Sequence, residues 1–322
     1  MKIRNGGIMV NYRCTAACRH CLYACSPTRA AGYITGGKMR EVCVLLDRGG
    51  CRSVHIGGGE PFLDCNGLIT VIRELRNAGI MLDYIETNAY WAANDGLVSE
   101  RLEMLMDEGA DTLCISLDPF HAEYVPYEYP LRLAHLCEQR GMGFFLWKQQ
   151  FLPALSRLDG KKPHDRAELE QALSPGYIGE TAHSYGIHHG GRAVNIEEEY
   201  RSLRPAAELL DDVPCGNLLS GDHFHVDKDG FFIPSGCTGL RLPLAEVVNT
   251  DTVPPGTYPV FEALYKGGIR ELRALARQYE FTERESGYAS KCNMCFHIRA
   301  FLSKHGFAEL DEEHYAESLR YY

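Results

Sequence analysis

The chain has 322 residues, of which 45% are hydrophobic and 24% charged, a balance that is ordinary for a globular protein with a buried core. Its formal net charge of -10 excludes a generic nucleic-acid-binding surface, because such a surface must be basic. No apolar run reaches the roughly 18 residues that a membrane-spanning helix needs, and the start of the chain lacks the apolar core of a signal peptide. We therefore expect a cytoplasmic protein that binds neither nucleic acid nor membrane.

Short apolar runs alternate with amphipathic helical patterns as far as about residue 195. In chain order they predict a strand at 6–12, a helix at 35–49, a strand at 53–59, a helix at 66–79, a strand at 81–90, a helix at 97–109, a strand at 111–118, a helix at 130–141 and a strand at 142–150. One or two helices are expected within 153–187, and 188–194 is predicted to be a sixth strand. Strands separated by helices pair in parallel through right-handed crossovers, so we expect an α/β fold, a partial (β/α)6 barrel of the TIM type.

The pattern changes after about residue 205. Residues 223–233 alternate around the turn DKDG and predict a β-hairpin, and 261–278 predicts a long helix. The cysteine pair of KCNMC follows that helix. We therefore expect two domains, a partial barrel at 1–205 and a small α+β domain at 206–322.

Three cysteines fall within CTAACRHC, directly after the first predicted strand: Cys14, Cys18 and Cys21. In a reducing cytoplasm, clustered cysteines more often bind metal than form disulfides. Four thiolates would close a structural zinc or iron–sulfur site, whereas three leave one position open. Thiolates suit both kinds of site, and free thiols or a zinc site completed by His20 or a distant residue are the alternatives.

A second motif, GGGEP at 57–61, follows the second predicted strand. Because the carboxyl ends of parallel strands meet at one edge, this motif and the cysteine loop should share one mouth. The spacing C-x3-C-x2-C, with the aromatic His20 before the last cysteine, together with GGGEP resembles the signature of the radical S-adenosylmethionine (SAM) superfamily.

That resemblance implies a [4Fe-4S] cluster held by the three cysteines, with an open iron that binds the amino and carboxylate groups of SAM. It implies an enzyme that takes an electron from a flavodoxin- or ferredoxin-type donor and cleaves SAM to a 5′-deoxyadenosyl radical. This radical abstracts a hydrogen atom from the substrate, while the protein orients and shields the reaction.

The resemblance also implies which residues bind SAM. The backbone of Gly57, Gly58 and Gly59 would approach its ammonium group, with the carboxylate of Glu60 beside that cation. The other implied contacts are His20, Asn88, Ser116, Asp118 and Arg192. Ordinary strand-end polarity is the alternative for Asn88 and Ser116.

Four further cysteines lie in the second half of the chain: Cys215, Cys237, Cys292 and Cys295. Their order resembles the twitch domain, the shortened form of the SPASM extension of many radical SAM enzymes, and implies a second, fully ligated [4Fe-4S] cluster. The spacing departs from that pattern, because Gly230 lies seven positions before Cys237 rather than about five. A zinc knuckle is the alternative. A closed cluster would conduct an electron, which implies a redox-changing reaction, or hold the domain together.

Acid–base candidates come from two places. Asp222 and His225 belong to the predicted hairpin, and His55 lies just before the glycines. Histidine suits proton transfer near neutral pH, although half-exposed structural histidines are common.

Two enzymatic functions follow. The first is hydrogen abstraction from a small metabolite or short peptide in a redox-changing modification, and the second is modification of a ribosomal peptide or protein side chain. The chain begins only a few residues before its first strand, which leaves no room for a leader-peptide recognition domain and favours the first. A non-catalytic iron–sulfur electron carrier or scaffold would keep the thiols, but it has no use for GGGEP.

Overall fold

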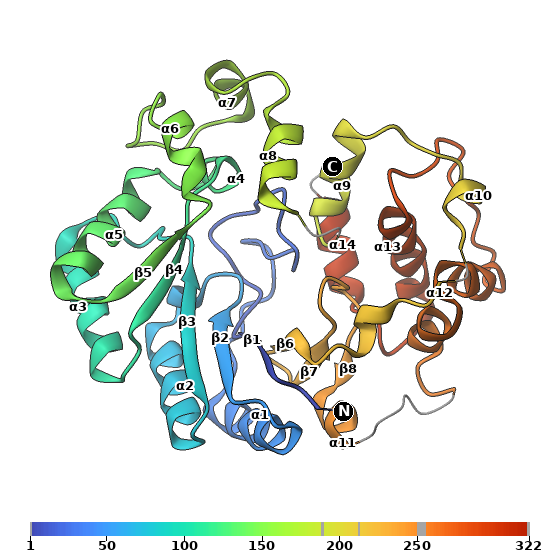
Figure 1. Ribbon diagram of the computed structural model, residues 1–322, viewed down its shortest axis with the longest axis horizontal. Helices are drawn as coiled ribbons and strands as arrows, with labels where there is room; N and C mark the ends of the chain where they lie inside the picture. Colours follow the sequence, from blue (N-terminus) through green and yellow to red (C-terminus); the bar gives the residue numbers. More distant parts are fainter. Residues whose placement is uncertain (1, 188–189, 212, 250–255, 321–322) are drawn as a thin grey trace.

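One eight-stranded sheet forms the centre of the fold, in the order β5-β4-β3-β2-β1-β6-β7-β8 (Figure 1). The computed structural model describes residues 2–187, 190–211, 213–249 and 256–320. The strands are β1 (Asn5–Met9), β2 (Ser53–Gly57), β3 (Met81–Thr87), β4 (Thr112–Ser116), β5 (Gly143–Trp147), β6 (Asp222–Asp227), β7 (Phe231–Ile233) and β8 (Leu242–Pro243). Strands β1 to β6 pair in parallel with their neighbours, and β7 and β8 add two antiparallel pairings.

Helices connect the first five strands, as the sequence predicts. They are α1 (Gly36–Gly49), α2 (Cys65–Asn77), α3 (Asp95–Asp107) and α5 (Glu128–Arg140), with the short α4 (Pro119–Ala122) and η1 (Pro61–Leu63) beside them. Local chemistry sets the ends of these helices. Thr35 and Asn94 accept hydrogen bonds from the first turns of α1 and α3, and Gly50 ends α1 in the left-handed conformation. The parallel βα pattern of residues 5–147 is therefore confirmed.

The sixth strand predicted at 188–194 is wrong. Residues 188 and 189 lie outside the described part of the chain, and α9 (Ala193–Tyr200) begins where the strand should end. Gly191 has a left-handed backbone, and a Cβ there would lie closer than 3.0 Å to the carbonyls of Cys21 and Leu22. This close packing produces a tight turn rather than an extended strand.

The sixth parallel strand comes instead from the predicted hairpin. β6 pairs in parallel with β1, and β7 folds back on β6, which confirms the hairpin itself. Gly230 supplies the left-handed turn residue, with φ 88°. The sheet therefore continues across residue 205, where the sequence suggested a domain boundary.

The remaining helices form two groups, one above β4 and β5 and one beyond β8 (Figure 1). The first group contains η2 (Gln149–Phe151), α6 (Leu152–Leu155), α7 (Arg166–Ala172) and α8 (Tyr177–Tyr185), so the helices expected within 153–187 are present. The second half contains α10 (Ala206–Leu209), η3 (Gly216–Leu219), α11 (Leu244–Asn249), α12 (Pro259–Arg277), α13 (Lys291–Leu302), η4 (Ser303–His305) and α14 (Glu312–Arg320). The long helix is confirmed as α12, with non-helical backbone angles at Gly268. No helix in the described part of the chain has the length and apolar character needed to span a bilayer.

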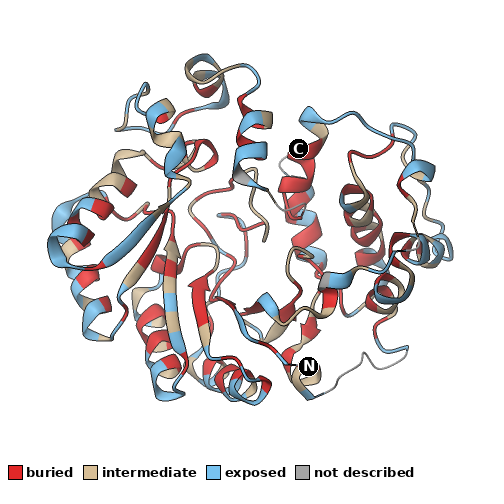
Figure 2. Ribbon diagram, in the orientation of Figure 1, coloured by how far each residue is buried: buried red, intermediate tan, exposed pale blue. Residues whose placement is uncertain are grey.

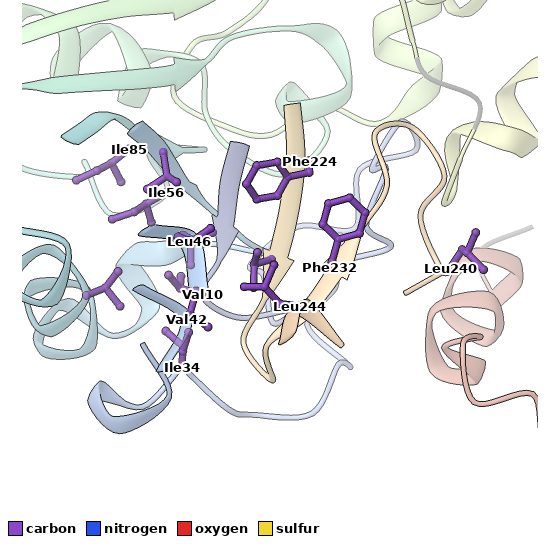
Figure 3. Packing of buried hydrophobic residues seen from close by; sticks show 14 of the residues in the cluster. Val10, Ile34, Val42, Leu46, Ile56, Ile85, Phe224, Phe232, Leu240 and Leu244 are labelled. Atoms are coloured by element: carbon purple, nitrogen blue, oxygen red, sulfur yellow. The ribbon is translucent and has the colours of Figure 1, made fainter. Parts of the chain in front are cut away.

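The main apolar core runs along the sheet and joins both halves of the chain. Figure 3 shows Phe224 of β6 and Phe232 of β7 near Leu244. The two phenylalanine rings stack with their centroids 5.6 Å apart. Ile56 and Ile85 belong to the same buried cluster. Figure 2 shows that β1 is largely buried, whereas β5, at the sheet edge, is mostly exposed. The core therefore fixes β1 and β6, the strands that carry the groups described next.

Candidate functional site

A cavity of about 410 Å³ lies at the carboxyl ends of the parallel strands. The cysteine loop after β1 and the glycines after β2 both line it, so the two motifs share one mouth as predicted. The predicted site residues that line it are Cys14, Cys18, His20, Cys21, Gly58, Gly59, Asn88 and Ser116. Side chains from β3, β4 and β5 complete the wall.

The cysteine loop is held from behind by Arg192. This side chain is fully buried, and its guanidinium donates to the carbonyl oxygens of Cys18, at 2.9 Å, and Cys25. Its backbone N–H donates to the carbonyl of Cys21 at 3.0 Å. Arg192 does not line the cavity, so the structure places it as a clamp on the loop rather than as the SAM contact that the resemblance implied.

The cysteine sulfurs accept hydrogen bonds, as metal-bound thiolates do. The backbone N–H of Ala16 lies 3.4 Å from the Cys14 sulfur, and the Asn88 side-chain amide lies 3.6 Å from it. The backbone N–H of Cys25 donates to the Cys21 sulfur at 3.3 Å. The Cys25 thiol also hydrogen-bonds that sulfur, which lowers the pKa of Cys21. These contacts favour the thiolate form of Cys21, the form that binds iron or zinc, whereas burial raises the pKa of Cys14.

The glycines of GGGEP are required first for packing against the chain that leads into the cysteine loop. A Cβ on Gly58 would lie closer than 3.0 Å to the Asn11 side chain, and one on Gly59 would overlap the carbonyl of Arg13. Asn11 accepts a hydrogen bond from the Gly59 N–H at 2.9 Å. Gly57 ends β2 and does not line the cavity. The two motifs are thus locked together by backbone contact.

Glu60 is fully buried and does not line the cavity. Its carboxylate accepts hydrogen bonds from the Phe62 N–H at 3.1 Å, the Thr87 hydroxyl at 2.9 Å and the Asn88 N–H at 2.8 Å. The predicted contact between Glu60 and the ammonium group of SAM is not supported by this position. Glu60 instead ties the GGGEP turn to the end of β3.

We expect Glu60→Gln to lower the free energy of unfolding by about 2 kcal/mol near pH 8, where Glu60 is ionised, because the new amide cannot accept from donors at both of its ends as the carboxylate does. Burial raises the pKa of Glu60 to about 7, above its value in the unfolded chain. The folded protein therefore binds a proton that the unfolded chain releases, and this contribution to stability is lost as the pH rises from about 5 to 8. Urea titrations at both pH values should show this loss in the wild type and not in Glu60→Gln. The exposed Glu103→Gln is the control, and an unchanged pH slope in Glu60→Gln would contradict the assignment.

Asp118, His121 and Cys18 form a polar chain beside the loop. His121 Nδ1 lies 2.6 Å from Asp118 Oδ2, and its ring also hydrogen-bonds the Cys18 thiol. Burial opposes charge on His121, but Asp118 and Cys18 raise the pKa of His121 well above its usual value. Asp118 also accepts from the N–H groups of Phe120 and His121, which caps α4. Asp118 therefore orients His121. Asp118 itself is not among the described residues that line the cavity.

Two histidines from the strands on either side of β1 meet over that strand, below the cavity. His55 of β2 and His225 of β6 both lie opposite Gly7 of β1, and their Nε2 atoms are 3.0 Å apart. A Cβ on Gly7 would lie closer than 3.0 Å to both rings. Neither ring lines the cavity directly, but Tyr84 stacks on His55 at 4.9 Å and does line it. The two histidines thus lie one layer below the cavity wall, and the acid–base role expected for them stays a prediction.

Asp222 lies away from this group. It begins β6 on the surface, and its carboxylate pairs with Arg4 at 2.5 Å while both side chains are exposed. The prediction that Asp222 takes part in acid–base chemistry is therefore not supported. A bulge explains the separation, because the β1–β6 register shifts next to His223, which has φ 54°.

Sequence reasoning missed Glu86, which lines the cavity from β3. The strand periodicity could have found it, because Tyr84, Glu86 and Asn88 alternate along β3 and all three line the cavity. His121, which also lines the cavity, was missed as well.

The four later cysteines come together although they are far apart in sequence. Cys215 precedes η3, Cys237 follows β7, and Cys292 and Cys295 lie in the first turn of α13. Burial, opposed by Arg299 and helped by smaller contributions from the other three thiols, raises the pKa of Cys237 to about 12. These mutual effects show that the four thiols lie near one another.

Arg299, one turn beyond Cys295 on α13, accompanies this group. It is buried, hydrogen-bonds the Cys295 thiol, and donates to the Thr238 carbonyl at 2.9 Å and the Tyr315 hydroxyl at 3.0 Å. A buried guanidinium favours negative charge on the thiols beside it.

Donor spacing bears on the choice between zinc and an iron–sulfur cluster. In the described part of the chain, one group of three or more side chains brings its donor atoms within 4.8 Å of one another: His20, Asp118 and His121. Neither cysteine group meets that distance. A single zinc ion with Zn–S bonds of about 2.3 Å would hold its sulfurs about 3.8 Å apart. Thiolates suit both a zinc ion and a cluster, in which separate irons each take one thiolate.

No protein-family model and no curated protein sequence matches this chain. Among solved structures it is similar to Streptococcus suis SuiB bound to its precursor peptide SuiA, with 16% identity and a TM-score of 0.39 over 80% of this chain and 66% of SuiB. It is also similar to anSMEcpe with bound AdoMet, with 14% identity and a TM-score of 0.44 over 93% of this chain and 96% of that one. A third is BtrN with AdoMet and 2-DOIA, with 13% identity and a TM-score of 0.39 over 84% and 90%. The chain thus spans about two thirds of SuiB, and these values are too low to carry over the activity of any of the three.

Proposed function

We propose that this chain is a radical SAM enzyme. The observation that carries the proposal is the shared cavity, into which Cys14, Cys18 and Cys21 open together with the backbone of Gly58 and Gly59. The three thiols of C-x3-C-x2-C suit a [4Fe-4S] cluster with one open iron, and the Cys25 thiol, which also lines the cavity, hydrogen-bonds the Cys21 sulfur. An electron carrier or scaffold has no use for a ligand-sized cavity beside its cluster.

The chain's own residues would then have distinct tasks. Cys14, Cys18 and Cys21 hold the cluster, which supplies the electron that cleaves SAM to a 5′-deoxyadenosyl radical. The Asn88 amide supports the Cys14 sulfur and the Thr15 hydroxyl, and so fixes the loop against β3. The partial-barrel arrangement of β1 to β5 encloses the substrate and keeps water from the reacting atoms.

Cys215, Cys237, Cys292 and Cys295 would hold a second [4Fe-4S] cluster in a twitch-like unit spanning 206–322. The support for this is the gathering of the four thiols near the buried Arg299. A fully ligated cluster has no open iron for substrate, so its role is to pass an electron. We therefore favour a redox-changing modification, of the oxidoreductase type.

The cavity volume of about 410 Å³ lies toward the lower end of the range for small-molecule sites, about 300–1,000 Å³. It accommodates a small metabolite or one side chain of a short peptide beside SAM. Modification of a ribosomal peptide remains the alternative, with the target side chain entering the same cavity.

Anaerobic reconstitution with iron and sulfide tests the proposal. We expect about eight iron atoms per chain and release of 5′-deoxyadenosine from SAM after dithionite is added. About eight irons without cleavage would support the electron carrier instead. Bound zinc at the first cysteine group, or no metal there, would refute the proposal.

A further inference from the structure

A buried cation, Arg299, accompanies the four later cysteines. Its side chain is 3% exposed and lies one turn beyond Cys295 on α13. Its Nη1 atom donates to the Thr238 carbonyl oxygen at 2.9 Å, directly after Cys237 in the chain, and to the Tyr315 hydroxyl at 3.0 Å. The guanidinium is therefore held where the loop after β7 and the first turns of α13 bring their cysteines together.

This guanidinium has no carboxylate partner within 4.0 Å in the part of the chain that the structure describes. Its oxygen partners are an uncharged carbonyl and an uncharged hydroxyl, and its buried Nε atom donates to no nitrogen or oxygen there. Arginine stays protonated in proteins, and a buried charge is costly unless an opposite charge lies nearby. Tyr315, Cys295 and Cys237 are the ionisable groups that stabilise its charge. Thiols ionise more readily than a phenol, so the cysteines are the source of the missing negative charge.

Two other charged side chains near the four thiols are already paired. Lys291 forms an ion pair with Asp211 at 3.0 Å, and both side chains are partly exposed. The carboxylate of Glu197 lies 3.4 Å from Arg201. Neither of these groups offers a counter-charge to Arg299.

Arg299 acts on all four thiols. Burial raises the pKa of Cys215, Cys237 and Cys292, and Arg299 opposes that rise in each of them. It also hydrogen-bonds the Cys295 thiol. Net charge and hydrogen bonds to the sulfurs set the reduction potential of an iron–sulfur cluster, and reduction adds a negative charge to it. A buried cation shared by its four ligands would therefore favour the reduced form.

We propose that Arg299 is the counter-ion of the second cluster and raises its reduction potential, so that this cluster accepts an electron. The inference rests on the proposed function, because it needs an iron–sulfur cluster at the four later cysteines. In that reaction the substrate radical left by hydrogen abstraction gives up one electron, the cluster gains it, and the substrate is oxidised. Arg299 does not line the described cavity, so it is a positioning residue that acts through the cluster.

The test measures the midpoint potential of the second cluster by anaerobic redox titration with EPR detection. Full-length Cys18→Ala protein is used, because it is expected to hold the second cluster alone. We expect Arg299→Gln to lower the equilibrium constant for reduction at least about tenfold, which is about 59 mV for a one-electron couple. Arg299→Lys keeps the charge and should keep most of the original potential. Arg140→Gln removes an exposed arginine from the last turn of α5 and, as the matched control, should cause no shift.

Iron is counted in the same samples, because Arg299→Gln removes hydrogen bonds as well as a charge. Loss of the irons in Arg299→Gln, with about four retained in Arg299→Lys, would show that the charge is required and would support the inference. Loss of the irons in both variants would overturn it, because the shape of the arginine and not its charge would then hold the group together.

An unchanged or higher potential in Arg299→Gln would also overturn the inference, as would an equal fall in Arg299→Lys. Zinc at the second group of the wild type would refute it while SAM cleavage persists. Failure of the proposed function is seen separately, as missing iron at the first cysteine group or missing SAM cleavage in the wild type.

Discussion

Replacing Cys18 with alanine is expected to abolish SAM cleavage, by at least about 1,000-fold, and to lower the iron content from about eight to about four atoms per chain. Cys18 is 6% exposed and lines the cavity between the other two thiols of its loop. Two remaining thiolates cannot hold a cluster that presents one open iron. Cleavage is measured as 5′-deoxyadenosine formed after reduction, and iron is counted in the same anaerobic sample.

Two matched variants make this result specific. Cys43→Ala removes a buried thiol from α1, away from both cysteine groups, and should keep about eight irons and full cleavage. Cys295→Ala should lose about four irons from the second group and still cleave SAM, because the first group is intact. Cleavage by Cys18→Ala at the wild-type rate would contradict the site assignment. Loss of cleavage in Cys43→Ala would show that the assay reports folding instead.

The parallel βα units and the hairpin could be predicted because their signals are local. Hydrophobic periodicity, helix caps such as Thr35 and the turn at Gly230 each act within a few residues. The pairing of β6 with β1 could not be predicted, because it joins segments more than 200 residues apart and no local pattern encodes it. The error at 188–194 has this origin, since the sixth strand was assigned to the segment that follows the fifth βα unit along the chain.

In the candidate site, too, features with a local signal could be predicted and features that depend on long-range contacts could not. The positions of the cysteine loop and of GGGEP follow from the rule that parallel strands end at one edge, and the structure brings them together. The direction of each side chain depends instead on its neighbours in space. Glu60 turns inward because Thr87 and Asn88 supply donors there, and Arg192 turns toward the loop carbonyls. Motif position thus located the cavity but did not settle which charged groups face it.

Gly7→Ala is expected to lower the free energy of unfolding by about 3 kcal/mol, the upper part of the range for overpacking a filled interior. A methyl group there would lie closer than 3.0 Å to His55 Nε2 and to His225 Cδ2. Neither ring can move away easily, because His55 is stacked on Tyr84 and both histidines are buried. Denaturant titration gives the loss, and Gly37→Ala on α1, where a Cβ meets nothing within 4 Å, should show none.

The double variant Gly7→Ala/His55→Ala identifies the cause of that loss. If the methyl group destabilises the fold through steric overlap with the histidine pair, removal of the His55 ring relieves that overlap. The double variant should then be more stable than the sum of the two single losses predicts. Strict additivity would mean that Gly7 is needed for the backbone of β1 alone. A Gly7→Ala variant that unfolds like the wild type would show that this layer is loosely packed.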